Sequence, residues 1–177
     1  MEKKDIRREV RSRLAALPES GRMEASAKIF GRMAEDEGFR SAGVVAAFAS
    51  LPDEPSTAGF LREWGGRKRI VLPRVEGDGT MNFYDYVPGS MNGGAYGISE
   101  PLPMSLCRPE EIDFMIVPGV AFTSEGKRLG RGKGFYDRYM SLPGFRARTA
   151  GVCFSVQIVD DLPTEKHDLL VDTVLHA

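Results

Sequence analysis

The stretch that most constrains the fold of this chain is residues 113–139, in which an apolar run leads directly into a glycine-rich basic loop. The run DFMIV has the length and composition of a buried strand. In the loop, glycines are interleaved with cations: Gly126, Gly130, Gly132 and Gly134 with Lys127, Arg128, Arg131 and Lys133. Glycine lets the backbone approach a ligand closely, and a helix beginning beyond the loop offers unpaired N–H groups. The pattern therefore predicts a strand–loop–helix unit that holds an anion, with a polyphosphate as its natural ligand.

The glycine spacing separates this loop from two common nucleotide-binding motifs. A Walker A loop requires Ser or Thr after its lysine, whereas Gly134 follows Lys133 here. The glycines are spaced G-x-G-x-G, which differs from the G-x-G-x-x-G of dinucleotide-binding folds. From the residues alone, the alternative interpretation is a solvated basic turn, with Phe135 and Tyr136 anchored in the core.

Periodicity along the chain predicts buried strands that alternate with helices. Helical spacing covers residues 3–17 and 19–37, a short helix starts near Ser56 and runs to Trp64, and another covers 135–142. Strand-like runs cover residues 43–50, 69–75, 81–87, 113–117 and 149–154, with a sixth in the tail at 169–177, and residues 88–109 are expected to be loop. This order predicts an α/β fold, a single three-layer domain over residues 1–177 with a mainly parallel central sheet flanked by helices.

Charge and cysteine content narrow the class of protein. With 24 basic and 25 acidic side chains, we expect no nucleic-acid partner and no polybasic membrane anchor. The charged N-terminal segment does not read as a signal peptide, and no apolar run approaches the ~20 residues of a membrane span. Cys107 and Cys153 stand without a CxxC or His cluster, which is typical of reduced thiols in a cytoplasmic protein.

Each polar member of the loop has a chemical reason to lie at a phosphate site. Lys133 is a compact ammonium suited to a terminal phosphate, and Arg128 and Arg131 are forks suited to bidentate phosphate contact. Asp137 falls about one turn into the expected helix, where its carboxylate can hold Mg²⁺ directly or through water. Tyr136 offers a ring face for stacking and a hydroxyl group.

Other candidates are ambiguous when taken alone. Glu54 follows the first expected strand, where a carboxylate can bind a polar heterocycle, although a surface turn is the more common setting. Lys3 and Arg7 lie one turn apart on the first helix, and Tyr96 lies in a tight YGISEP loop. The two histidines, His167 and His176, are far apart and have no Cys partners, which disfavours a zinc site or a catalytic triad.

The sequence resembles a known family at several of these positions. RLGRGKGFYDRY, preceded by PGVAF, resembles the signature of 5-formyltetrahydrofolate cyclo-ligases, which are also called 5,10-methenyltetrahydrofolate synthetases. Four further segments, KKDIR, SLPDEPST, YGISEP and QIVDDLPTEKHDLLVDTVL, are similar to the basic first helix, the substrate loop, the aromatic loop and the C-terminal segment of that family. The resemblance extends over nearly the whole chain.

The resemblance implies an enzyme that converts 5-formyltetrahydrofolate and ATP, with Mg²⁺, into 5,10-methenyltetrahydrofolate, ADP and phosphate. It assigns the catalytic cations to Lys133 and Arg131, the substrate contacts to Glu54, Tyr96 and Tyr136, and Mg²⁺ to Asp137. The nucleotide would be held by Lys3, Arg7, Arg128, Gly130, Arg131, Gly132, Lys133, Gly134, Phe135, Tyr136 and Asp137.

Two positions depart from the family pattern. Phe135 stands where the family often has Tyr, and Thr123 stands where an Asp commonly occurs, so metal or substrate binding is expected to differ there. Asp172 is a further acidic candidate near the site. The competing hypotheses are a non-catalytic nucleotide- or folate-binding protein, an enzyme acting on sugar phosphates or coenzyme A esters, and an RNA-binding module, which the balanced charge disfavours.

Overall fold

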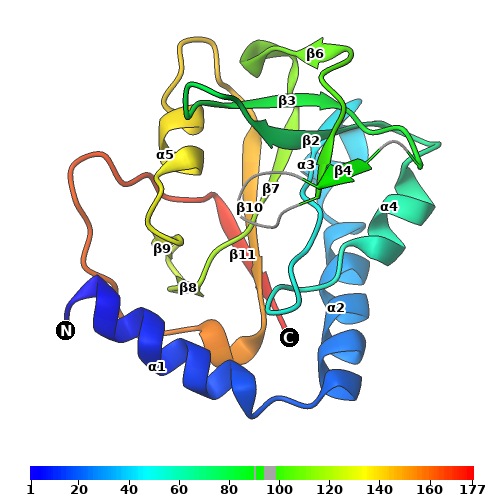
Figure 1. Ribbon diagram of the computed structural model, residues 1–177. Helices are drawn as coiled ribbons and strands as arrows, with labels where there is room; N and C mark the ends of the chain where they lie inside the picture. The colour runs from blue at the N-terminus through cyan, green and yellow to red at the C-terminus, as the bar shows by residue number, and fades with distance from the viewer. Residues whose placement is uncertain (90, 94–98) are drawn as a thin grey trace.

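A computed structural model of the chain describes residues 1–89, 91–93 and 99–177 (Figure 1). The helices in this described part are α1 (Lys3–Ala15), α2 (Glu19–Met33), α3 (Glu37–Ser41), α4 (Ala58–Trp64) and α5 (Phe135–Met140), with 3-10 turns η2 (Pro109–Glu111) and η3 (Ser155–Gln157). None of these helices is long and apolar enough to cross a membrane.

The strands of the main sheet follow the order β11-β10-β7-β1-β2-β3-β6. Their bounds are β1 (Val44–Ala46), β2 (Arg69–Val75), β3 (Met81–Asp85), β6 (Leu106–Cys107), β7 (Phe114–Val117), β10 (Arg148–Cys153) and β11 (Thr173–His176). The strands from β11 to β2 pair in parallel, whereas β3 and β6 continue the sheet in antiparallel fashion. The expected mainly parallel α/β fold is therefore confirmed.

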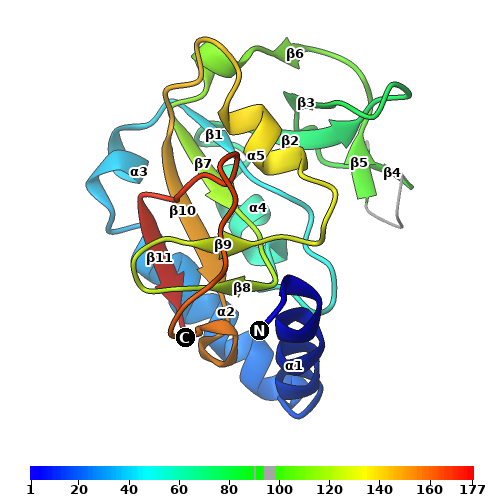
Figure 2. The ribbon, with the colours of Figure 1, turned by 90° about the vertical axis from the view of Figure 1, so that its left-hand side faces the viewer.

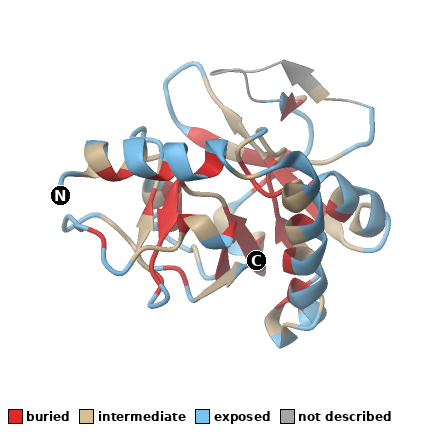
Figure 3. Ribbon diagram, turned by 90° about the horizontal axis from the view of Figure 1, so that it is seen from below, coloured by how far each residue is buried: buried red, intermediate tan, exposed pale blue. Residues whose placement is uncertain are grey.

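The sheet is buried on both faces because its central strands are apolar at nearly every position. On one face, Val45, Ile70 and Phe114 pack against α2, α3 and α4, with Phe39 and Phe60 among the contacts. Figures 1 and 3 show α2 and α4 flanking this side, with buried residues along the strands and exposed residues on the outer surfaces of the helices. Large apolar side chains on both faces thus produce the expected three layers.

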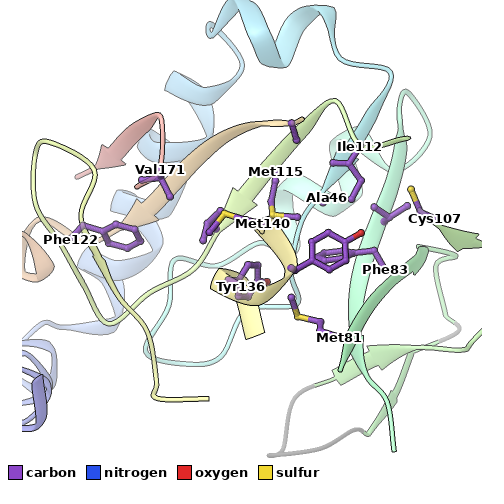
Figure 4. Close-up of a cluster of buried hydrophobic side chains, with 14 of the residues drawn as sticks. Ala46, Met81, Phe83, Cys107, Ile112, Met115, Phe122, Tyr136, Met140 and Val171 are labelled. Atoms are coloured by element: carbon purple, nitrogen blue, oxygen red, sulfur yellow. The ribbon is translucent and has the colours of Figure 1, made fainter. Parts of the chain in front are cut away.

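The opposite face is covered by α5 and by a small hairpin of β8 (Ala121–Phe122) and β9 (Arg128–Leu129). Figure 4 shows Tyr136 and Met140 of α5 gathered with Met81, Phe83 and Met115 of the sheet. This packing fixes α5 directly after the glycine-rich loop. The loop is consequently held between a strand and a buried helix rather than left as a solvated turn.

Helix α1 packs outside the sheet, on the β8–β9 hairpin. Its buried stripe, Ile6, Val10 and Leu14, follows helical spacing and joins a separate core cluster with Ala121 and Leu129. Figure 2 shows α1 beside the hairpin, with the N-terminal end of the helix near the segment that precedes β11. The first helix therefore brings its basic residues beside the glycine-rich loop.

Several expected boundaries were wrong. The helix expected at 19–37 ends at Met33, and Gly38 lies inside α3, because Asp36 caps a new helix through the Phe39 N–H at 3.1 Å. The loop expected at 88–109 contains the β4–β5 hairpin (Met91–Gly93 and Ser99–Pro101) and the edge strand β6. The glycine-rich loop itself contains β8 and β9. Short strands of two or three residues carry too little periodicity to be recognised in sequence.

Candidate functional site

A cavity of about 470 Å³ opens at the carboxyl ends of β1, β2 and β7, where open α/β sheets bind their ligands. Its cationic lining comes from α1 and the glycine-rich loop: Lys3, Arg7, Arg128, Arg131 and Lys133, with Gly130, Gly132 and Gly134 between them. Its acidic lining is Glu54, Glu100, Asp137, Glu165 and Asp168, and its apolar lining includes Phe48, Leu51, Pro73, Val75, Met81, Phe135 and Tyr136. The cavity therefore combines a cationic wall with apolar and acidic side chains.

The glycine-rich loop takes backbone conformations that other residues rarely adopt. Gly132 and Gly134 have φ values of 106° and 72°, and Gly134 immediately precedes α5. Because α5 is only six residues long, its dipole is a small source of positive potential. The positive potential at this loop therefore comes mainly from its side-chain cations.

Arg128 lies in the floor of the cavity as an internal cation. Its Nε donates a hydrogen bond to the Pro118 carbonyl oxygen at 2.6 Å, and its guanidinium lies 5.1 Å from the centroid of the Tyr136 ring. Burial lowers the pKa of Arg128 from its ordinary value, an effect opposed by Asp137, whose Oδ2 lies 3.8 Å from Nη1. Arg128 is thus held in one orientation and presents a fixed charge to the cavity.

Arg131 joins the glycine-rich loop to the loop that follows β1. Its Nη2 donates a hydrogen bond to Asp53 Oδ1 at 2.7 Å and lies 3.6 Å from Glu54 Oε2. Burial lowers the pKa of Arg131. The carboxylates of Asp53 and Glu54 together raise it by a larger amount, so the net shift is upward. The two loops that the sequence assigned to different ligands therefore meet through one guanidinium.

Glu54 is a buried carboxylate, 8% exposed, at the end of the cavity lined by the loop after β1. Its Oε1 accepts a hydrogen bond from the Leu51 backbone N–H at 2.8 Å. Burial raises the pKa of Glu54, and the Leu51 N–H and Arg131 only partly offset this effect. Because a buried carboxylate is unfavourable without further hydrogen bonds, Glu54 is suited to accept them from a ligand.

Lys3 and Arg7 project from α1 into the same cavity. Lys3 Nζ donates a hydrogen bond to Asp168 Oδ2 at 2.8 Å, and this bond raises the pKa of Lys3. Arg7 Nε donates to the Gly130 carbonyl oxygen at 2.8 Å, which ties α1 to the glycine-rich loop. The structure therefore places both expected residues beside the loop. Their one-turn spacing on α1 did not by itself indicate this proximity.

The segment 165–168 is the part of the cavity that the sequence did not predict. Burial raises the pKa of Asp168, but the hydrogen bonds from Lys3 and the Glu165 backbone N–H, together with the charge of Lys3, outweigh it, so the net shift is downward. Glu165 and His167 line the cavity beside it. No ligand was assigned to this segment from the sequence, although TEKHD lies within the stretch that resembles the C-terminal segment of the family; its charged residues are also common in solvated loops.

Asp137, which the resemblance assigns to Mg²⁺, lies in the first turn of α5. It lines the cavity, and its Oδ1 accepts a hydrogen bond from the Leu169 N–H at 3.2 Å. The described residues contain no group of three or more Asp, Glu, His or Cys side chains that could enclose a metal ion. Mg²⁺ commonly takes one or two protein carboxylates and completes its octahedron with phosphate oxygens and water, so Asp137 and Asp168 fit such a shared site.

The remaining expected positions fall in different places. Tyr96 lies outside the described residues. Tyr136 is largely buried in the core cluster and meets the cavity with part of its surface, while Phe135 lines the cavity without a hydroxyl. Thr123 is fully buried and accepts the Lys127 N–H at 3.1 Å in the β8–β9 turn, and Asp172 accepts the Thr149 N–H at 2.8 Å. Neither Thr123 nor Asp172 is among the described residues that line the cavity.

Fold and site together define an α/β protein with a cavity that has both cationic and apolar walls at the carboxyl ends of its parallel strands. The model of the 5-formyltetrahydrofolate cyclo-ligase family matches residues 1–177, and this chain belongs to that family. The fold of the chain and the family of its sequence therefore lead to the same class of enzyme.

Individual relatives agree with this assignment. The 5-formyltetrahydrofolate cyclo-ligase of Mycolicibacterium smegmatis is 31% identical over 143 residues, covering 76% of this chain and 74% of the relative. The enzyme of the same name from Escherichia coli K12 is 29% identical over 178 residues, covering 94% and 95%. The structure of Aquifex aeolicus 5,10-methenyltetrahydrofolate synthetase superposes with a TM-score of 0.88 at 33% identity, covering 99% of this chain and 90% of that one. Membership of this family supports cyclo-ligase activity in folate one-carbon metabolism.

Proposed function

We propose that this protein uses ATP and Mg²⁺ to convert 5-formyltetrahydrofolate into 5,10-methenyltetrahydrofolate, with release of ADP and phosphate. The observation that carries the proposal is a single cavity in which the glycine-rich cationic wall adjoins an apolar wall bearing the buried carboxylate of Glu54. A phosphate donor and a heterocyclic acceptor can be held in contact only where both kinds of wall are present. Arg131 marks the point at which they meet.

The reaction requires positioning and charge neutralisation more than a protein nucleophile. The formyl oxygen attacks the γ-phosphorus of ATP, the bond to the bridging oxygen breaks, and ADP leaves. N10 of the folate then attacks the activated formyl carbon, its proton is lost, and the C–O bond breaks to release phosphate. Negative charge develops on the transferred phosphoryl group, where Lys133 and Arg131 are placed to stabilise it.

The other residues of the cavity have supporting roles in this proposal. Lys3 and Arg7 contribute positive charge from α1, and Arg128 supplies a fixed charge beneath the loop. Gly130, Gly132 and Gly134 let backbone N–H groups approach the phosphates closely. Glu54 and the apolar wall hold the pteridine, with Phe135 and Tyr136 forming part of that wall.

Asp137 and Asp168 would hold Mg²⁺ together with phosphate oxygens. When bound, the ion would neutralise phosphate charge and fix the geometry of the triphosphate. Asp168 accepts a hydrogen bond from Lys3 in the structure, so Lys3 keeps this carboxylate in place beside the cavity. The free, buried thiols of Cys107 and Cys153 accord with a reducing compartment, and we place the protein in the cytoplasm.

A single-omission assay tests the proposal. Appearance of the methenyl product, followed by its absorbance, is expected only when ATP, Mg²⁺ and 5-formyltetrahydrofolate are all present. Folded protein that forms no product under these conditions would contradict the proposed reaction. If calorimetry on that same protein showed binding of folate or nucleotide, the chain would instead be a binding protein of the same fold.

A further inference from the structure

A second buried carboxylate, Glu100, lines the cavity and has no role in the reaction described above. It belongs to β5 and is 4% exposed. Its Oε2 accepts a hydrogen bond from the Val75 backbone N–H at 2.6 Å, at the carboxyl end of β2. Residues 88–109 were expected to be loop, whereas Glu100 lies in a short strand and lines the cavity.

Glu100 is placed much as Glu54 is. Glu54 lies in the loop after β1, and Glu100 of β5 is hydrogen-bonded to the carboxyl end of the neighbouring parallel strand β2. Each is a buried glutamate that uses one carboxylate oxygen to accept a backbone N–H. Within the described part of the chain, the structure records no hydrogen bond to Oε1 of Glu100. Because Glu100 lines the cavity, a ligand that brings N–H groups to this wall could donate to Oε1, which the described protein groups do not.

A role in folding alone does not account for an ionisable side chain here. The β4–β5 hairpin is also attached to β2 by Arg74, whose Nη1 donates to the Pro101 carbonyl oxygen at 3.0 Å. The Val75 N–H needs only one acceptor, which a neutral amide could provide at a much lower desolvation cost. Pro73, Val75 and Met81 form an apolar surface next to Glu100, as a flat heterocycle requires.

We propose that Glu100 is a specificity-determining residue that accepts hydrogen bonds from the N–H donors of the substrate heterocycle. The inference rests on the proposed function, in which that heterocycle is the pteridine of a reduced folate. A pteridine carries a ring N–H and an exocyclic amino group side by side, and a carboxylate accepts from two such parallel donors. Glu54, from the loop after β1, and Glu100, from β5, then both bind the pteridine.

The substitution Glu100→Gln separates recognition from hairpin docking. The amide oxygen can still accept the Val75 N–H, which leaves the amide NH₂ facing the donors of the substrate. We expect the Kd for 5-formyltetrahydrofolate, measured by calorimetry without ATP, and the KM for the same compound to rise about 10- to 100-fold, with the KM for ATP nearly unchanged. Unchanged folate affinity in folded Glu100→Gln would overturn the inference.

Two control variants make the result specific. Arg74→Met removes the other docking hydrogen bond and keeps the Glu100 carboxylate, so it should lower the unfolding temperature while leaving folate Kd within about threefold of the wild type. If Arg74→Met weakens folate binding as much as Glu100→Gln does, docking explains the effect and the inference fails. Glu63→Gln, on the exposed side of α4, is expected to change neither quantity.

The outcomes for the wild type distinguish this inference from the proposed function. Wild-type protein that neither binds nor converts 5-formyltetrahydrofolate would overturn both. Wild-type protein that does both, together with an unaffected Glu100→Gln variant, would overturn only the role of Glu100. Should the variant not fold, a crystal structure of the wild type with 5-formyltetrahydrofolate decides: Glu100 Oε1 within hydrogen-bond distance of a pteridine nitrogen supports the inference, and its separation from the ring refutes it.

Discussion

Arg131 and Asp53 form a hydrogen-bonded ion pair, with Arg131 Nη2 2.7 Å from Asp53 Oδ1, and this pair connects the glycine-rich loop to the loop after β1. The same guanidinium lies 3.6 Å from Glu54 Oε2. A triphosphate at the glycine-rich loop would compete with both carboxylates for Arg131. Occupancy of the nucleotide wall therefore changes the charge felt by the wall assigned to folate, and the two binding events should be linked.

Removing the negative charge of Asp53 should favour nucleotide binding. In Asp53→Asn, Arg131 loses its nearest carboxylate and is freer to bind phosphate. The pair is partly exposed, and such pairs contribute about 1 kcal/mol or less, so we expect the KM for ATP to fall by no more than about fivefold. Steady-state kinetics at varied ATP measures this change. A KM for ATP that rises instead would show that Asp53 holds Arg131 in its productive orientation.

Lys133 is expected to contribute mainly to the rate of phosphoryl transfer. If its ammonium stabilises the transferred phosphoryl group, Lys133→Ala should lower kcat by roughly 10²-fold, which corresponds to about 3 kcal/mol. Lys127→Ala is the matched control, because Lys127 belongs to the adjacent hairpin and pairs with Asp161 at 2.6 Å instead of lining the cavity. A kcat near the wild-type value in Lys133→Ala would contradict the role given to this lysine.

Glu54 should weaken the fold while strengthening substrate binding. Burial raises its pKa above the ordinary value of 4.5, so the folded protein binds more protons at this site than the unfolded chain does. Stability at this site is therefore fully present below pH 4.5 and declines as the pH rises through the folded-state pKa. Glu54→Gln, which stays neutral, is expected to have a higher unfolding temperature than the wild type at neutral pH, with the difference vanishing in acid.

The same Glu54→Gln variant should bind folate less well. Loss of a charged acceptor is expected to raise the KM for 5-formyltetrahydrofolate roughly 10- to 100-fold at neutral pH. In the wild type, this KM should rise as the pH is lowered through the raised pKa of Glu54, and in the variant this pH dependence should disappear. Thermal unfolding and kinetics over the same pH series would measure both effects. A variant that is less stable at neutral pH would show that the pairing with Arg131 exceeds the cost of burial.

Gly126 should be required for the fold rather than for the chemistry. Its φ is 97°, and a Cβ at this position would lie 2.3 Å from the Val171 carbonyl oxygen. Gly126→Ala is therefore expected to reduce the free energy of unfolding by about 2–3 kcal/mol. Gly66→Ala is the control, because a Cβ there meets nothing within 4 Å. Chemical denaturation of both variants would test this prediction. Equal free energies of unfolding for Gly126→Ala and Gly66→Ala would contradict the structural role given to Gly126.

The long elements were predictable because their signals are local. The apolar spacing of α1 and the buried run of β7 depend on residues a few positions apart, so their existence was clear without a fold. The β4–β5 hairpin, β6 and the β8–β9 hairpin were not predicted, since strands of two or three residues are defined by their pairing partners. The break between α2 and α3 was missed because it depends on the capping contact of Asp36.

By itself, the sequence determined the alternation of strands and helices, the cations of the glycine-rich loop and the family that these residues resemble. Only the tertiary structure decided that Glu100 and Asp168 share one cavity with that loop, that Lys3 reaches Asp168 there, and that Arg131 pairs with Asp53. Residues 165 positions apart, such as Lys3 and Asp168, meet only because the packing of α1 and the order of the strands place them together. Local patterns specify elements, whereas burial and strand order specify which elements share a site.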